Sequence, residues 1–360
     1  MVNRPAFGLR GAPKYVGRVL EGLDLAKVGP WLEANVEGAV GPFEASLIGG
    51  GRSNLTFTVV GSDGTKFVLR RPPLGHVLAT AHDMAREHKI IAAVGKTSVP
   101  VPPALGLCED PEVNGAPFYV MGYVDGVVLD GPAKASQLDP SLRQKASDDL
   151  IDVLADLHAV DIDAVGLGDL ARREGYIERQ VKRWSTQWAN SKTRELSAID
   201  EVATLLREKM PQQQGAVIAH GDYRFGNCLT DTTVGRIAAV LDWELCTLGD
   251  PLADVGYLRV YWSNPGEEGR HNDPTSAGGF PSYEDLLERY ANRTGRDVSG
   301  VDYYVAFSSW RLAVISEGVY ARYLHGAMGD QGMTQDDLDG MKQGTENLAE
   351  NALTAVRRLR

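Results

Sequence analysis

An aspartate and an asparagine lie five residues apart in a loop that follows a short apolar run. The run, residues 216–219, is typical of a buried strand, and the loop after it reads HGDYRFGN, with Asp222 and Asn227 as its polar members. An aspartate so placed can accept a hydroxyl proton, and an amide oxygen can ligate Mg²⁺. At this spacing an attacking oxygen and a metal-bound phosphate could face each other. The alternative is that Asp222 only caps a turn.

A second apolar run, residues 237–241, ends at Asp242, fifteen residues after Asn227. One carboxylate and one amide oxygen form a partial shell for Mg²⁺, which prefers oxygen ligands and shares them with substrate phosphates. Asn227 and Asp242 are therefore the candidate metal ligands.

The segment GGGRSNLTFTV, residues 49–59, places three glycines between two strand-like runs. Glycines let the backbone approach a ligand closely, and successive amides can cradle phosphates. Gly50, Gly51, Ser53 and Asn54 are the candidate phosphate contacts. Glycine-rich hairpin turns without a ligand are common, so the segment by itself leaves both interpretations open.

Further along, strand alternation places Val68 and Arg70 on one face, and Glu87 lies in a helical pattern over residues 80–94. A strand cation held by a helix carboxylate suits the binding of phosphates. The alternative is an exposed arginine and an ordinary surface glutamate.

The order of glycine loop, strand cation, helix glutamate, HGDxxxxN and strand-terminal aspartate resembles the protein-kinase-like fold. Its HGD form is similar to the aminoglycoside phosphotransferase (choline kinase-like) family. The segments FVLRRPP, AHDMAREHKII and LDWELCTLGDPLADVGYL are more closely similar to the phosphotransferase domains that animals fuse to acyl-CoA dehydrogenases, and to stand-alone bacterial relatives. That group is associated with phosphorylating hydroxylated acyl compounds.

The resemblance implies ATP and Mg²⁺ as cofactors and gives each candidate residue a role. Asp222 becomes the catalytic base, Asn227 and Asp242 become the magnesium ligands, and Arg70 with its partner Glu87 neutralises phosphate charge.

The resemblance also implies where adenine binds. The Gly122 carbonyl and the Val124 amide would meet its edge, and Leu55, Val68 and Leu229 would sandwich its ring. Simple core packing is the alternative for Met121 and Leu229. The full set of expected nucleotide contacts is Gly50, Gly51, Ser53, Asn54, Leu55, Val68, Arg70, Met121, Gly122, Val124 and Leu229.

Three departures from the protein-kinase pattern affect function. Arg70 stands where the fold usually has lysine, Asp242-Trp243-Glu244 replaces DFG, and no APE-like segment follows. The reaction that we expect is transfer of the γ-phosphoryl group to a hydroxyl of a small molecule rather than of a protein. The alternative is a pseudokinase-like module that binds nucleotide without turnover, which Arg70 permits.

The expected fold is α+β and bilobal: an antiparallel sheet with one helix, then a mostly helical lobe. We expect leader helices over residues 1–40, with Pro30 in a first helical turn. A nucleotide-binding lobe of strand, strand, helix, strand, strand follows over 41–121. A hinge at 122–126 then leads to a catalytic and acceptor-binding lobe over 127–360.

Composition and charge disfavour some classes of binding partner. The 360 residues carry a net charge of −11, which disfavours nucleic acid and anionic membranes. Residues 1–125 hold 12 basic and 12 acidic side chains, and the rest hold 25 and 36. Three scattered cysteines without a CxxC pair, no signal-like N-terminus and no membrane-spanning run indicate a cytoplasmic protein. No obligate protein partner is inferred.

Four further polar residues flank the motifs. We expect His158 to pack beneath the catalytic loop and His220 to orient the loop by hydrogen bonding. Asp250 and Asp254 either cap the helix that begins near Pro251 or line the acceptor pocket.

The acceptor itself stays open between aminoglycosides and hydroxyacyl compounds. A polycation needs a carboxylate-lined pocket, whereas an acyl chain needs an apolar tunnel with basic residues at its mouth if coenzyme A carries it. Residues 263–282 either shape the acceptor site or are disordered. The candidate mouth residues, for which a solvated helix face is the favoured interpretation, are Arg172, Arg173, Lys182 and Arg183.

Overall fold

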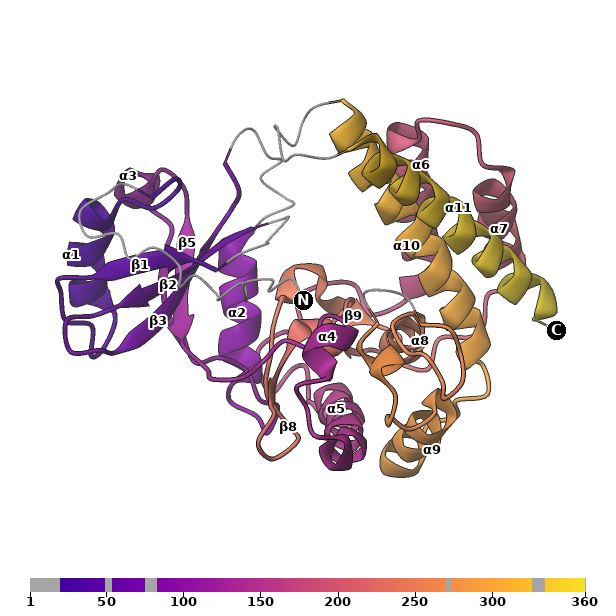
Figure 1. Cartoon of the computed structure of the whole chain (residues 1–360), viewed down its shortest axis with the longest axis horizontal. Helices are drawn as coiled ribbons and strands as arrows, with labels where there is room; N and C mark the ends of the chain where they lie inside the picture. Colours follow the sequence, from indigo (N-terminus) through magenta and orange to yellow (C-terminus); the bar gives the residue numbers. More distant parts are fainter. Residues whose placement is uncertain (1–19, 49–53, 75–82, 270–272, 326–333, 360) are drawn as a thin grey trace, which may run out of the picture. The chain divides into compact units, whose positions relative to one another are not determined.

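The computed structural model describes residues 20–48, 54–74, 83–269, 273–325 and 334–359. The chain forms two compact units (Figure 1). Unit 1 comprises residues 1–96 and 101–124, and unit 2 comprises residues 97–100 and 125–360. The division between Val124 and Asp125 falls inside the segment 122–126 that we expect to be a hinge.

Unit 1 is built on one antiparallel sheet with the strand order β1-β2-β3-β5-β4. The predicted order of strand, strand, helix, strand, strand is present, and the first extended run is two strands, one on each side of the glycine-rich segment. The elements are β1 Glu44–Leu47, β2 Leu55–Val60, β3 Lys66–Arg71, β4 Ala104–Cys108, β5 Phe118–Gly122, α1 Leu25–Asn35, α2 Met84–Val94 and the short α3 Pro111–Asn114.

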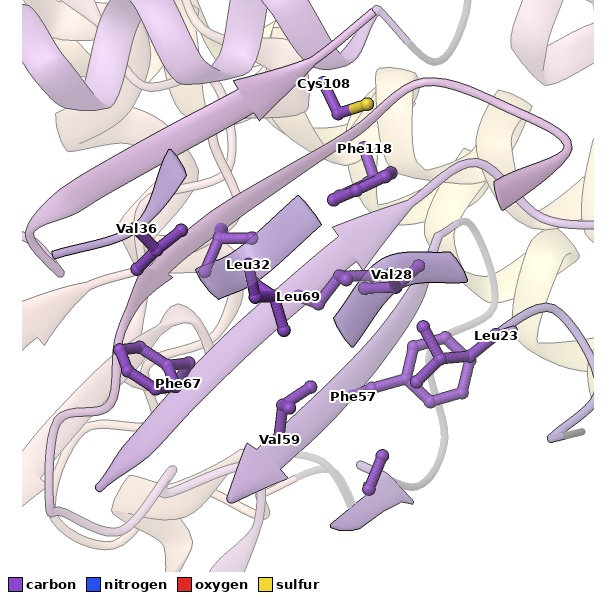
Figure 2. Packing of buried hydrophobic residues seen from close by; sticks show 12 residues of the cluster. Leu23, Val28, Leu32, Val36, Phe57, Val59, Phe67, Leu69, Cys108 and Phe118 are labelled. Carbon is purple, nitrogen blue, oxygen red and sulfur yellow. The ribbon is translucent and has the colours of Figure 1, made fainter. Parts of the chain in front are cut away.

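Alternation along the strands gives the sheet two different faces. Phe57, Leu69 and Phe118 point to the face that α1 covers, where they meet Val28 and Leu32 in an apolar cluster (Figure 2). The opposite face carries Arg70 next to α2. One face of the sheet thus packs in the apolar core, and the other carries the polar side chains of the candidate site.

The N-terminal helix differs from its prediction. Pro30 does not open a helix but lies inside α1, which begins at Leu25 after the cap residue Asp24. A proline there removes the hydrogen bond to the carbonyl of Ala26. Ala26 and Pro30 are both exposed, so water can solvate that carbonyl, and the buried Val28 and Leu32 hold the helix against the sheet.

Unit 2 is mostly helical, as expected, and contains two small antiparallel ladders, β6 with β9 and β7 with β8. Short 3-10 turns lie at Phe225–Asn227, Trp243–Leu245 and Pro274–Ala277. The helices and strands are α4 Pro132–Ala135, α5 Pro140–Ala159, α6 Tyr176–Ser191, α7 Ser197–Glu208, β6 Val217–Ala219, β7 Cys228–Asp231, β8 Arg236–Val240, β9 Thr247–Gly249, α8 Leu252–Val260, α9 Tyr283–Thr294, α10 Val301–Leu324 and α11 Gln335–Arg358.

Helix α10 is the centre of unit 2, because α6, α7, α8 and α11 all pack against it (Figure 1). Two of its charged residues, Arg311 and Glu317, are buried. Glu317 accepts hydrogen bonds from the amide and hydroxyl of Thr193 and pairs with Arg194 at 3.3 Å. Within the described residues, no helix is both long and apolar enough to cross a membrane.

The close contact between α8 and α10 gives a prediction about stability. A Cβ atom on Gly256 would lie 2.6 Å from Cβ and 2.7 Å from the carbonyl carbon of Tyr304, so Gly256→Ala forces two helix backbones apart. We expect it to lower the free energy of unfolding by about 1–3 kcal/mol in denaturant titrations. Gly340→Ala is the matched control: its Cβ meets nothing within 4 Å, so a gain of about 0.5–1 kcal/mol is expected. Equal effects of the two substitutions would contradict the packing.

Candidate active site

The loop that carries Asp222 is held by the buried carboxylate of Asp254 in α8. Its two oxygens accept hydrogen bonds from the amides of His220 and Gly221, each at 2.7 Å. Gly221 has φ +84°, and a Cβ there would lie 2.7 Å from the carbonyl oxygen of Leu245. Two successive amides thus converge on one carboxylate, which fixes the course of the backbone immediately before Asp222.

His158 lies beneath this loop, as predicted. Its Nε2 is 3.2 Å from Asp254 Oδ2, and its Nδ1 is 2.7 Å from the hydroxyl of Tyr290. Burial raises the pKa of Asp254, but the hydrogen bond and charge of His158, with the Gly221 amide, outweigh it and hold that pKa below the ordinary 3.8. The carboxylate under the loop is therefore ionised at neutral pH.

His220 orients the loop, also as predicted. Its Nδ1 accepts the amide hydrogen of Asp222 at 3.2 Å, and its Nε2 lies 2.9 Å from the carbonyl oxygen of Leu241. The ring also packs on Trp243, with 4.8 Å between centroids. One imidazole thereby ties the segment containing Asp222 to the end of β8, where Asp242 stands.

Asn227 is hydrogen-bonded to Asp222. Its side-chain nitrogen donates to the Asp222 backbone carbonyl at 2.7 Å and to Asp222 Oδ2 at 2.6 Å. Since the nitrogen is committed, the amide oxygen is the atom that can ligate a cation. The Asn227 carbonyl accepts the amide of Leu241 at 2.8 Å, so Asp242 follows directly on a residue bonded to Asn227.

Asp242 has φ 62° and is the one non-glycine residue with positive φ in the described part of the chain. Such a conformation is unfavourable for a side-chain-bearing residue and is often found at functional sites. The donors of Asn227 and Asp242 are the hard oxygens that Mg²⁺ prefers. Among the described residues no group of three or more His, Cys, Asp or Glu side chains could hold a metal ion, so phosphates and water would complete its shell.

Two arginines beside this loop were not assigned a role from the sequence. Arg311 of α10 donates to the carbonyl of Gly221 at 2.6 Å, and its guanidinium lies 4.3 Å from the centroid of Tyr257. Arg224 places Nε 3.4 Å from Asp222 Oδ1, with its guanidinium 4.6 Å from the centroid of Tyr261. The signal for Arg311 was a cation interrupting an apolar helical run.

The two tyrosines complete the surroundings of Asp222. Burial, and then the negative charge of Asp222, raise the pKa of both Tyr257 and Tyr261. Both phenols are therefore neutral at physiological pH and can serve only as neutral hydrogen-bonding groups.

The segment 263–282 is anchored in its described parts. Asp273 accepts hydrogen bonds from the amide and hydroxyl of Thr275 at 2.9 and 2.8 Å, and Phe280 packs edge-on against Phe225 of the loop that carries Asp222. Phe225 in turn stacks on Trp262 at 5.7 Å. Disorder is thus the wrong interpretation for residues 273–282, which support the loop from behind.

Asp250 and Asp254 do not line a pocket, because their exposed fractions are 0% and 1%. Asp250 accepts from the amide of Leu252 at 3.0 Å and so caps the start of α8, as one alternative held. Asp254 does neither of the two things expected of it: it lies in the first turn of α8, and its carboxylate binds the amides of the loop that carries Asp222.

In unit 1, Arg70 and Glu87 form the predicted ion pair, with 3.1 Å between Nε and Oε2. The glutamate is buried, and it also accepts from the side chain of Asn54 at 3.2 Å and from the hydroxyl of Tyr119 at 3.1 Å. Glu87 is therefore no surface residue. Asn54, expected at the phosphates, has its side-chain nitrogen directed at Glu87.

The strand register corrects one part of the adenine prediction. Leu55 is opposite Arg71, whereas Val68 is opposite Thr58 and Met121, so Leu55 and Val68 point to opposite faces of the sheet. Leu55 packs on the apolar cluster under α1. The two side chains cannot flank one ring.

Val68 and Met121 share the face of Arg70, and both are nearly buried, at 7% and 8% exposure. The amide of Gly122 donates to the carbonyl of Pro103 at 2.8 Å. The adenine contact expected of the Gly122 carbonyl stays a prediction. The nucleotide contacts expected of Val124 and Leu229 also stay predictions. Gly50, Gly51 and Ser53 lie outside the described residues.

The four basic residues considered for coenzyme A binding have the contacts of a solvated surface rather than those of one common binding site. Arg173 pairs with Asp163, and the side chain of Arg183 lies over the ring of its neighbour Trp184. Arg172 and Lys182 are exposed.

Comparison with known proteins decides the family. A model described as "phosphotransferase enzyme family" matches residues 44–292, more than half of the chain and all of the loop described above. The chain belongs to this phosphotransferase family. It is also 35% identical over 293 residues to mouse acyl-CoA dehydrogenase family member 10, an alignment that covers 80% of this chain and 27% of that protein. The chain thus spans about a quarter of the length of this relative.

Solved structures of phosphotransferases show the same fold. A candidate aminoglycoside phosphotransferase from Ralstonia eutropha is 33% identical, with a TM-score of 0.78 over 94% of this chain and 99% of that chain. The aminoglycoside phosphotransferase APH(4)-Ia, as a thermostable mutant in complex with AMP-PNP and hygromycin B, is 16% identical, with a TM-score of 0.57 over 91% and 98%. The fold is protein-kinase-like, with an antiparallel N-terminal sheet and a mostly helical C-terminal region, which confirms the expected class.

The support of the loop by Asp254 can be tested by Asp254→Asn. An amide offers one acceptor oxygen for two converging amides, so we expect a loss of about 1–3 kcal/mol in the free energy of unfolding at pH 7. Because the pKa of Asp254 is lowered by folding, this stabilisation is complete above the ordinary pKa of 3.8 and is lost as the pH falls through the folded-state value.

Denaturant titrations between pH 7 and about pH 3 measure the difference between wild type and variant. The difference should be constant near neutrality and shrink in acid. Asp302→Asn, an exposed aspartate in the first turn of α10, is the matched control. A difference that grows as the pH falls would contradict the assignment.

Proposed function

We propose that the protein transfers the γ-phosphoryl group of ATP, with Mg²⁺, to a hydroxyl of a small molecule. The observation that carries the proposal is the pair of hydrogen bonds from Asn227 to Asp222, which couples a base to a metal-binding oxygen across five residues. Membership of the phosphotransferase family supports the reaction type. The AMP-PNP and hygromycin B bound by APH(4)-Ia support a nucleotide donor and a small-molecule acceptor.

Asp222 is the residue that receives the hydroxyl proton in this proposal. Its Oδ1 is buried and faces Arg224, so Oδ2 is the oxygen that an acceptor hydroxyl would reach. Oδ2 already accepts from Asn227, and a carboxylate oxygen has a second lone pair for the acceptor. The carboxylate orients the hydroxyl and takes its proton as the oxygen attacks phosphorus.

Asn227 and Asp242 would hold Mg²⁺ through one amide oxygen and one carboxylate, and the ion would neutralise charge on the transferred group. In unit 1, the buried Glu87 holds the guanidinium of Arg70, whose side chain is 13% exposed, in one orientation. We assign this guanidinium to the nucleotide phosphates, for which its planar fork is suited. Catalysis then consists of positioning and charge stabilisation, with no covalent intermediate on the protein.

The proposal is tested with Asp222→Asn, which keeps the size of the side chain and removes the base. Turnover of MgATP with a panel of hydroxy acids, their coenzyme A esters and aminoglycosides is measured by ADP formation. We expect kcat to fall by about 10²–10⁴-fold for whichever acceptor is active, while the Kd for MgATP changes by less than about threefold.

Asp297→Asn, which removes an exposed carboxylate in the loop after α9, is the matched control and should keep full activity. Residual turnover that is equal in wild type and Asp222→Asn would instead favour a nucleotide-binding module without catalysis. So would MgATP binding with no Asp222-dependent turnover in the panel.

A further inference from the structure

The carboxylate of Glu87 in α2 is bound by side chains from three other segments of unit 1. Asn54, the residue before β2, donates from Nδ2 to Oε1 at 3.2 Å. Arg70 of β3 and Tyr119 of β5 both donate to Oε2, from Nε and from the hydroxyl, each at 3.1 Å. Rotation about the last bond of a glutamate side chain is ordinarily broad, so holding both oxygens fixes the plane of this carboxylate.

The donors approach Glu87 from both sides of the strand that carries Arg70. The sheet order places β3 between β2 and β5, with Tyr119 in β5 and Asn54 directly before β2. Tyr119 is opposite Arg70 in the β3–β5 ladder, so the two side chains leave the same face of the sheet and converge on one oxygen. The position of Glu87 is therefore set by the sheet on both flanks of β3.

Burial separates Arg70 from the other three residues. Asn54, Glu87 and Tyr119 are each 2% exposed, whereas the side chain of Arg70 is 13% exposed. Apolar side chains of similar volume would fill such a site at no greater cost in stability, because a buried ion pair seldom repays its desolvation. The three buried polar residues therefore point to a role beyond stability: they hold one cation, in one orientation, where a ligand can reach it.

Orientation matters more for an arginine than for a lysine. A guanidinium donates in the fixed directions of its planar fork, whereas an ammonium can rotate its donors. Glu87 accepts from Nε of Arg70, so the direction of this hydrogen bond sets the plane of the guanidinium and with it the directions of the terminal N–H groups. A carboxylate that turned would turn those groups away from phosphate oxygens.

We propose that Tyr119 and Asn54 are positioning residues for the nucleotide: they hold the two oxygens of Glu87, and Glu87 in turn orients the guanidinium of Arg70 toward the phosphates. This inference rests on the proposed function, which assigns that guanidinium to the nucleotide phosphates. Neither Tyr119 nor Asn54 touches the nucleotide. Both act through Glu87 and Arg70, so their effect on nucleotide affinity depends on the presence of the guanidinium.

The test measures the Kd for MgATP by isothermal titration calorimetry without an acceptor, so it does not depend on turnover. Tyr119→Phe keeps the ring and removes the hydroxyl, and Asn54→Ala removes the amide donor. We expect each substitution to raise the Kd by about 3–10-fold, the effect of one hydrogen bond to a charged group. Arg70→Gln, which loses the charged fork, should raise the Kd by at least about tenfold.

The same two substitutions are then made in the Arg70→Gln protein. Residues that act through a shared partner are not additive, so Tyr119→Phe and Asn54→Ala should each change the Kd there by less than about 1.5-fold. A merely structural role would lower the affinity equally in both backgrounds. Tyr119→Phe decides the matter if Asn54→Ala does not fold, because it preserves the volume of the side chain.

Tyr303→Phe is the matched control. Tyr303 of α10 is also buried, and its hydroxyl donates to the carbonyl of Leu206 at 2.7 Å. Its removal takes away a comparable buried hydrogen bond in unit 2 and should leave the Kd for MgATP within about 1.5-fold of wild type. Thermal unfolding of every variant verifies that it is folded at the temperature of the titration.

An unchanged Kd in Tyr119→Phe, or an equal rise in the wild-type and Arg70→Gln backgrounds, would overturn this inference and leave the proposed phosphotransfer intact. An Arg70→Gln protein that binds MgATP as tightly as wild type would overturn it as well, while Asp222-dependent turnover would still support the transfer. No binding of MgATP by wild type would overturn the proposed function, and this inference with it.

Discussion

The candidate active site depends on one ionised carboxylate buried beneath a loop. Asp254 accepts the amides of His220 and Gly221, and without it two adjacent backbone N–H groups would be buried without acceptors. His158 lies on the other side of the same carboxylate, and its hydrogen bond to Tyr290 connects the support to α9. Asp222 is the next residue along the chain, so the backbone that carries its side chain is held in place.

Further contacts extend this constraint to the proposed metal ligands. Arg311 holds the carbonyl of Gly221 from α10, while His220 reaches the carbonyl of Leu241 and so joins the loop to Asp242. Asn227 completes the arrangement by donating hydrogen bonds to the backbone carbonyl and to a carboxylate oxygen of Asp222. The groups proposed for proton transfer and for metal binding are thereby positioned by backbone contacts. This suits a reaction whose catalysis is mainly positioning.

Sequence reasoning identified the parts of the site whose spacing is local. Asp222 and Asn227 are five residues apart, and the pairing of Arg70 with Glu87 follows from one strand and the next helix. Asp254 and Arg311 were not found as supports because their contacts to Gly221 span 33 and 90 residues, a separation that no local pattern encodes. The face of Leu55 was wrong because strand register decides it, and Pro30 was misplaced because packing of α1 outweighs local propensity.

The central claim is that Asp254 holds the loop that carries Asp222, and amide hydrogen exchange over residues 217–228 tests it most directly. In wild type this peptide should be strongly protected, and in Asp254→Asn it should exchange at least tenfold faster. Exchange over α11, which packs on α7 and α10, should be unchanged and serves as the internal reference. Equal protection of residues 217–228 in the two proteins would contradict the account.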